Sequence, residues 1–215
     1  MPDEATSNGG LVDPSNAPGT AFGLAMAAII MTIFGFIWLG WGFSASLTFT
    51  DFSGSHVLPA ALWIGFYAIF VGLLIFAIQA LRRARRRIKS LATPPQDFRA
   101  RFGKGFRLIS ILEGAGCGIV VFLAVFFQRL DLIAAGISIV VGLHFLPLAR
   151  LFHFAPYYLI GVAILLCDLV SLMAMRGQQI TFLSAAGTGG ILWTCAAYVL
   201  VRSRKLLTVD WVRRA

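Results

Sequence analysis

Long runs of apolar residues, separated by short polar stretches, dominate the pattern of this chain. A run of about 20 mostly apolar residues is long enough to cross a lipid bilayer as one helix. Six segments meet this requirement within a few residues: 21–43, 57–81, 108–127, 132–149, 154–175 and 180–201. The pattern therefore predicts an all-α integral membrane protein with about six transmembrane helices.

The composition agrees with the apolar pattern and excludes several classes of protein. The 215 residues are 59% hydrophobic and 13% charged, whereas soluble domains carry about 25% charged residues. This balance excludes a cytosolic enzyme, a disordered chain and a secreted disulfide scaffold. The three cysteines lie in apolar stretches without a C-x-x-C motif, so we interpret them as packing residues: Cys117, Cys167 and Cys195.

The distribution of basic residues predicts the orientation of the spans. Residues 82–107 hold ten Lys and Arg, residues 202–215 hold five, and Arg150 lies between the fourth and fifth spans. Only Arg129 and Arg176 fall on the other side of the predicted membrane. Because loops on the cytoplasmic side carry the excess of Lys and Arg, both termini are predicted to be cytoplasmic.

The loops divide the predicted chain into a hairpin and a larger unit. The expected parts are a disordered cytoplasmic tail (1–20), a transmembrane hairpin (21–81), a basic cytoplasmic loop (82–107), a four-span unit (108–201) and a basic cytoplasmic tail (202–215). The connections within the four-span unit are short, which predicts antiparallel neighbours. Ser44-Ala45-Ser46 resembles a signal-peptide cleavage site, but the acidic start and long apolar run favour a retained helix.

The basic loop has an aromatic repeat typical of membrane surfaces. Phe98, Phe102 and Phe106 recur every four residues, with cationic side chains between them. On a helix, this stripe would lie in the headgroup layer with its cations near anionic lipid. Gly103 and Gly105 weaken such a helix. Nucleic-acid binding is not expected, because basic loops on the inner face already explain the charge.

Two ionisable residues in the third and fourth spans are predicted to meet. A charged side chain at mid-membrane costs about 2.5–3.5 kcal/mol on insertion scales. Glu113 lies roughly 8 Å below the inner boundary, at 1.5 Å per helical residue, and His144 lies at a similar depth. The hairpin around 128–131 makes the two spans adjacent. The pair is predicted to bind protons or a cation; the alternative is that it only fixes helix packing.

A third ionisable residue, Asp168, lies in the outer half of the fifth span with Gly161 and Ser171 on its side. The alternatives are that Asp168 is neutral and bonded to a hydroxyl or the backbone, or that it lines an outward-facing cavity.

Small residues predict where helices approach one another closely. Gly114 and Gly118 form a G-x-x-x-G spacing on the third span, which permits close helix packing. This pair and the Gly187–Gly190 cluster are also candidate contact faces for a homo-oligomer.

Pro147 is expected to break the fourth helix near the inner surface. Proline removes a helical hydrogen bond and would leave carbonyls near Leu143 unpaired. His144, Arg150 and His153 would then cluster at a broken helix end, the kind of place where transporters bind ions or polar substrates. The alternative is a plain kink, with Arg150 extending to the interface.

One part of the chain resembles a known family. Glu113-Gly114, the run GLHFLPLARLF at 142–152 and YYLIG at 157–161 resemble a family of small bacterial integral membrane proteins built on a domain of unknown function. The resemblance covers about residues 100–200. It implies a multi-pass protein of the bacterial inner membrane and brings no activity, cofactor or catalytic residue.

Three functional hypotheses follow. The first is a small permease-like or channel-like protein that uses Glu113 and His144 as its titratable pair. The second is a non-catalytic scaffold or accessory subunit, and the third is an intramembrane enzyme using the same pair as acid and base. The sequence lacks a P-loop, G-x-S-x-G and H-E-x-x-H, and it predicts no metal or cofactor.

Overall fold

The computed structural model describes residues 17–46, 57–89, 97–152 and 154–208. These residues form six long helices: α1 (Ala17–Ser46), α2 (Val57–Lys89), α3 (Asp97–Phe126), α4 (Ile133–Phe152), α5 (Pro156–Ala174) and α6 (Gln178–Thr208), with a short 3-10 turn, η2 (Leu130–Leu132), before α4. All six helices are long and apolar enough to cross a membrane. The predicted all-α class with six spans is confirmed, and the chain is a multi-pass membrane protein.

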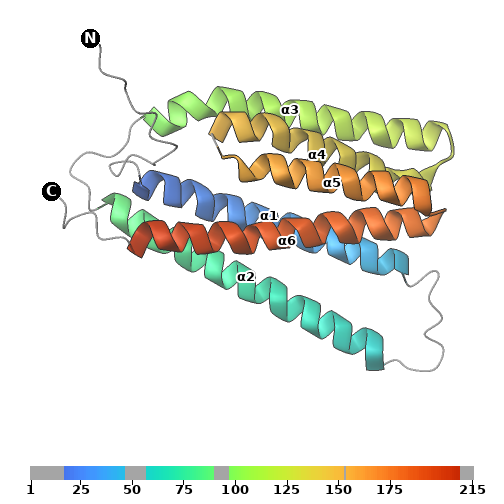
Figure 1. Ribbon diagram of the computed structural model, residues 1–215, viewed down its shortest axis with the longest axis horizontal. Coiled ribbons are helices and arrows are strands. Elements are labelled where there is room, and N and C mark those ends of the chain that lie inside the picture. The colour runs from blue at the N-terminus through green and yellow to red at the C-terminus, as the bar shows by residue number, and fades with distance from the viewer. Residues whose placement is uncertain (1–16, 47–56, 90–96, 153, 209–215) are drawn as a thin grey trace, which may run out of the picture.

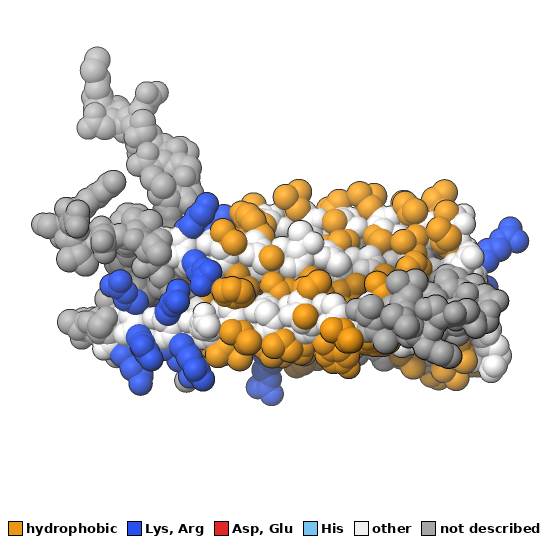
Figure 2. Space-filling model, turned by 90° about the horizontal axis from the view of Figure 1, so that it is seen from below, with side chains coloured by type: hydrophobic (Ala, Val, Ile, Leu, Met, Phe, Trp, Pro, Cys, Tyr) orange, Lys and Arg blue, Asp and Glu red, His pale blue; other side chains and the backbone are white. Residues whose placement is uncertain are grey.

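The six helices lie side by side in one elongated bundle (Figure 1). Successive helices run in opposite directions, as short connections require. The long basic segments at the end of α2 and the end of α6 lie at one end of the bundle, where Lys and Arg side chains gather (Figure 2). We call this the basic end. Hydrophobic side chains cover the middle of the face that Figure 2 shows, as a bilayer would require.

The most extensive packing in the bundle joins α1 to α6, a pair that the sequence pattern does not single out. Two side-chain hydrogen bonds tie the antiparallel pair together along its length. Ser203 Oγ donates to the carbonyl of Ala21 at 3.0 Å, and Trp193 Nε1 donates to the carbonyl of Thr32 at 3.0 Å. The first hairpin is thereby joined to the last span.

Glycines allow α1 and α6 to approach so closely. A Cβ added at Gly189 would lie 2.8 Å from the backbone nitrogen of Leu39 and 2.9 Å from the carbonyl oxygen of Gly35. On the other face of α6, a Cβ at Gly187 would overlap the Sγ atom of Cys167 on α5. Gly187 and Gly189, both from the predicted Gly187–Gly190 contact face, therefore pack against other helices of the same chain.

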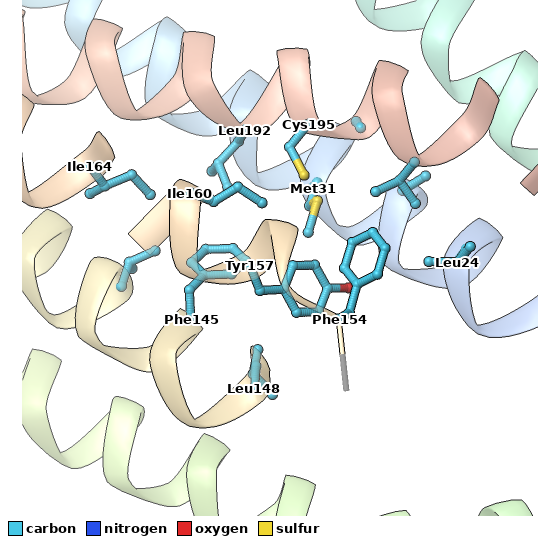
Figure 3. Packing of buried hydrophobic residues seen from close by; sticks show 14 of the residues in the cluster. Leu24, Met31, Phe145, Leu148, Phe154, Tyr157, Ile160, Ile164, Leu192 and Cys195 are labelled. Atoms are coloured by element: carbon cyan, nitrogen blue, oxygen red, sulfur yellow. The ribbon is translucent and has the colours of Figure 1, made fainter. Parts of the chain in front are cut away.

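The core lies where α1, α4, α5 and α6 meet (Figure 3). Its buried side chains are almost all apolar: Leu24 and Met31 from α1, Phe145 and Leu148 from α4, Phe154 from the turn before α5, Tyr157, Ile160 and Ile164 from α5, and Leu192 and Cys195 from α6. α2 and α3 lie at the periphery, with few buried residues. α2 packs on α1 and α6, whereas α3 packs mainly on α4.

The helices extend beyond the predicted spans at the basic end. α2 continues through the first basic cluster to Lys89, and α3 begins at Asp97, so both halves of the basic loop contain helix. α1 begins at Ala17, so residues 17–20, expected in the disordered tail, are helical instead. Phe106 is exposed, while the side chains of Phe98 and Phe102 lie outside the described residues. The predicted tails at 1–16 and 209–215 also lie outside them.

Candidate functional site

Glu113 on α3 and His144 on α4 lie in contact, as the hairpin geometry predicts. Oε2 of Glu113 is 3.2 Å from Nδ1 of His144. Both residues lie within helical segments that are apolar enough to span a membrane. The contact forms because α3 and α4 are antiparallel neighbours, and both residues lie in the half of their membrane-spanning segment that is nearer the basic end.

The contact has the distance of an ion pair but not the geometry of a hydrogen bond. Nδ1 of His144 has no hydrogen-bond partner within the described part of the chain. The imidazole also faces the backbone of Ile109, one turn before Glu113 on α3. Histidine is charged only when both ring nitrogens carry protons, so the attraction between the two side chains depends on the protonation of His144.

The pair lies at the edge of the bundle. The side chain of His144 is 11% exposed and that of Glu113 is 27% exposed, so the carboxyl is the more accessible partner. Cys117 lies one turn further along α3 and is partly buried. The site is therefore a carboxyl and an imidazole between two helices, with the outer side of α3 left open.

Two glycines let α3 and α4 approach each other near the pair. A Cβ at Gly116 would lie 3.0 Å from Cγ1 of Val140, and a Cβ at Gly136 would lie 2.5 Å from Cγ1 of Val120. The helices therefore interlock, with a valine of each facing a glycine of the other. This packing fixes the distance between the two helices beside Glu113.

Gly114 and Gly118 do not serve the helix contact predicted for them. Neither glycine would bring an added Cβ within 4 Å of another group, and both residues are exposed. Gly116 lies between them in sequence and takes the predicted role. Since successive helical residues point about 100° apart, Gly114 and Gly118 face away from α4 when Gly116 faces it.

The break predicted at Pro147 is wrong. α4 is continuous from Ile133 to Phe152, with Pro147 inside it. The helix tolerates the missing amide because Phe145, Leu148 and Ala149 are all buried around it and hold the turn in place. Pro147 itself is exposed.

Two other residues were predicted for this region. Arg150 is exposed near the end of α4, and His153 lies outside the described residues. The structure therefore assembles Glu113 with His144 and does not show the larger cluster expected around a broken helix end.

Asp168 forms the second polar site of the bundle. Its side chain is completely buried in α5, in the half of the bundle away from the basic end. Neither carboxyl oxygen has a hydrogen-bond partner within the described part of the chain. The hydroxyls of Ser138 on α4 and Ser184 on α6 face it. Complete burial does not fit the predicted outward-facing cavity, whereas the other alternative, a neutral carboxyl bonded to a facing hydroxyl, stays a prediction.

The hydroxyls around this carboxyl are bonded to other groups. Ser184 Oγ donates to Ser171 Oγ at 3.1 Å, and Ser171 Oγ donates to the carbonyl of Ile180 at 3.0 Å. Ser138 and Thr188 share a short hydrogen bond across α4 and α6. All four hydroxyl side chains are fully buried. Together with Asp168 they form what we call the Asp168 cluster: Ser138, Asp168, Ser171, Ser184 and Thr188.

No family model matches the chain, and no curated protein and no solved structure matches it either. The resemblance seen in residues 100–200 stays a prediction. We therefore infer the function from the chain's own side chains.

Sequence reasoning missed three members of the Asp168 cluster: Ser138, Ser184 and Thr188. A signal was present, because Thr181, Ser184 and Thr188 recur at helical spacing on one face of α6. Asp168 and Ser171 have the matching spacing on α5. A polar stripe on two successive spans predicts a buried polar contact between them.

The two sites offer different chemistry. Within the described residues, no group of three or more His, Cys, Asp and Glu side chains could hold a metal ion. The Glu113–His144 pair brings together two titratable groups, a carboxyl and an imidazole. The polar side-chain atoms of the Asp168 cluster are all carboxyl or hydroxyl oxygens.

Proposed function

We propose that the protein is a small channel-like or permease-like membrane protein that binds and moves protons through Glu113 and His144. The observation that supports this most strongly is the 3.2 Å contact between a carboxyl and an imidazole inside two spans. Ionisable side chains within membranes are costly, and they commonly mark proton relays. The neighbouring glycines and valines already pack α3 against α4, so the packing of these helices does not require an ionisable pair.

The chemistry of the pair supports proton transfer in both directions. An imidazole with an additional proton attracts the carboxylate at this distance, and it loses that attraction when the proton leaves. The more exposed carboxyl of Glu113 is the partner that exchanges protons with the surroundings, and His144 is the partner that holds them within the bundle.

The proposal includes an orientation and a location. The basic end faces the cytoplasm, so both termini lie inside, because Lys and Arg are enriched on that side of membranes. Its cations contact anionic headgroups. The family resemblance of residues 100–200 supports the bacterial inner membrane as the location.

Proton movement can be measured in proteoliposomes that contain a pH-sensitive dye. A potassium gradient with valinomycin sets a negative interior potential in sodium-free buffer. We expect proton entry faster than in protein-free liposomes. Glu113→Gln removes the titratable carboxyl and should abolish the difference. Asp131→Asn is the matched control, since it removes a carboxyl from an exposed ion pair with Arg129 and should leave proton entry unchanged.

Two results would contradict the proposal. One is a rate for the parent equal to that of protein-free liposomes. The other is a Glu113→Gln rate equal to that of the parent.

A second candidate function, that of an accessory subunit, is favoured by the outer face of α3. Gly114 and Gly118 are exposed there, beside large exposed apolar side chains such as Ile111 and Phe122. Small residues on a span permit close approach of another helix, from a second copy or a different protein. Co-purification of a stoichiometric partner that is lost in Gly114→Leu would support this role.

A further inference from the structure

We propose that the Asp168 cluster is a binding site for a sodium ion. The site uses neither residue of the Glu113–His144 pair, so the inference stands or falls independently of proton movement. Its starting point is that both oxygens of a fully buried carboxyl have no hydrogen-bond partner among the described residues. A buried carboxylate without donors is strongly unfavourable unless a positive charge compensates it.

The orientation of the surrounding hydroxyls favours a cation over further hydrogen bonds. A hydroxyl has one hydrogen to donate and two lone pairs. Ser184 uses its hydrogen on Ser171, so it presents lone pairs toward Asp168. The hydrogen bond between Ser138 and Thr188 uses one of their two hydrogens, so one hydrogen remains free to point toward Asp168. The two carboxyl oxygens therefore face at most one free donor, and the remaining hydroxyl lone pairs repel a carboxylate unless a cation lies between them.

A proton on Asp168 is the alternative to a cation. The protonated carboxyl would donate its hydrogen to one hydroxyl, and its other oxygen would accept the free hydrogen of Ser138 or Thr188. Neither carboxyl oxygen, however, lies in hydrogen-bond geometry with a hydroxyl among the described residues. A cation can instead be shared by both carboxyl oxygens and by the hydroxyl oxygens. Because the cluster contains one carboxyl, a monovalent cation leaves it neutral, whereas a divalent cation would leave an uncompensated buried charge.

The type and packing of the donors favour a small, hard ion. Carboxylate and hydroxyl oxygens are ligands for hard cations, not for soft transition metals. The helices are in tight contact at this level: a Cβ at Gly187, the neighbour of Thr188, would overlap Cys167, the neighbour of Asp168. Sodium fits such close packing better than the larger potassium ion.

A row of hydroxyls connects the cluster to the end of the bundle opposite the basic end. Thr181 lies on the same face of α6 as Ser184 and Thr188. Its Oγ1 donates to the carbonyl of Asp131 at 3.1 Å, in the turn between α3 and α4. The hydroxyls on this face of α6 therefore continue from the cluster to the turn between α3 and α4.

The test is the thermal stability of the purified full-length protein in detergent. Its melting temperature is measured in sodium chloride, potassium chloride and choline chloride at equal ionic strength. A ligand that binds only the folded state raises the melting temperature with its concentration. We expect sodium to raise the melting temperature above that in choline, and potassium to have a smaller effect.

Variants test whether the sodium-dependent rise in melting temperature comes from the Asp168 cluster. Asp168→Asn and Ser184→Ala should lose the sodium-dependent rise, while Glu113→Gln, outside the cluster, should keep the full rise. The measurement on the parent needs no variant, so it decides the question even if Asp168→Asn does not fold. Equal melting temperatures of the parent in sodium and choline would overturn the proposal, as would equal effects of sodium and potassium. A full sodium response in Asp168→Asn would also overturn it.

Discussion

The Nδ1 atom of His144 lies 3.2 Å from Oε2 of Glu113, across the interface of α3 and α4. This contact makes the two side chains energetically coupled. We expect Glu113→Ala and His144→Ala to be non-additive, with a coupling energy of about 0.6–2 kcal/mol, the range for polar contacts between membrane helices. The measurement is a double-mutant cycle of unfolding in detergent micelles.

The control for this cycle pairs Glu113→Ala with Ser44→Ala. Ser44 bonds only to the carbonyl of Gly40 on its own helix, among the contacts of the described residues. The effects of these two changes should add, because the sites share no partner. If the effects of Glu113→Ala and His144→Ala add, the contact between the two side chains contributes nothing to the free energy of unfolding.

The unpartnered carboxyl of Asp168 predicts an unusual stability effect. In sodium-free buffer, Asp168→Asn should stabilise the protein by about 1–3 kcal/mol, the cost of a buried unsatisfied polar group. The reason is that an amide can donate hydrogens to Ser138 and Ser184, which the carboxylate cannot do. Chemical denaturation in detergent measures the effect. Asp131→Asn, in an exposed ion pair, should change stability by only about 0–1 kcal/mol.

A lower stability of Asp168→Asn in sodium-free buffer would mean that the carboxyl is well satisfied by its surroundings. The assignment of the cluster as a cation site would then lose its physical basis.

The close packing of α1 on α6 predicts opposite effects at two adjacent glycines. Gly189→Ala places a Cβ within 2.8 Å of the backbone of Leu39 and should destabilise the protein by about 1–3 kcal/mol. Gly190→Ala meets nothing within 4 Å and should be neutral or stabilising by up to about 1 kcal/mol, because alanine favours helix. Thermal unfolding of the two variants provides the comparison, and equal effects would contradict the α1–α6 register.

The proposed orientation predicts that a fluorescent protein fused after residue 215 folds in the cytoplasm. A periplasmic alkaline phosphatase fused at the same place should be inactive, because this enzyme matures only outside the cytoplasm. The reverse pattern would place the basic end outside and contradict the proposed topology.

The fold class was predictable because membrane spans are visible in the sequence as long apolar runs. The Glu113–His144 contact was predictable too, since a tight turn makes consecutive spans neighbours and both residues lie at equal depth. The packing of α1 on α6 was not predictable, because helices in lipid all have apolar surfaces, so the apolar pattern does not reveal which faces meet.

Other errors have local physical causes. Gly116, not Gly114 or Gly118, faces α4, because the G-x-x-x-G spacing indicates a small-residue face but not the direction in which it points. Pro147 does not break α4, because buried neighbours hold the helix against the lost hydrogen bond. The hydroxyls around Asp168 come from three helices, and single-sequence patterns do not show which helices share an interface.

We propose that Glu113 is retained for proton movement and not for packing. The most direct test measures proton flux and thermal stability on the same preparation of Glu113→Gln beside the parent. Glutamine keeps the size of the side chain and can still contact His144, but it cannot titrate near neutral pH. We predict a melting temperature equal to or above that of the parent, together with loss of proton flux. A variant that melts clearly earlier yet keeps the parent's flux would contradict a role of Glu113 in proton movement.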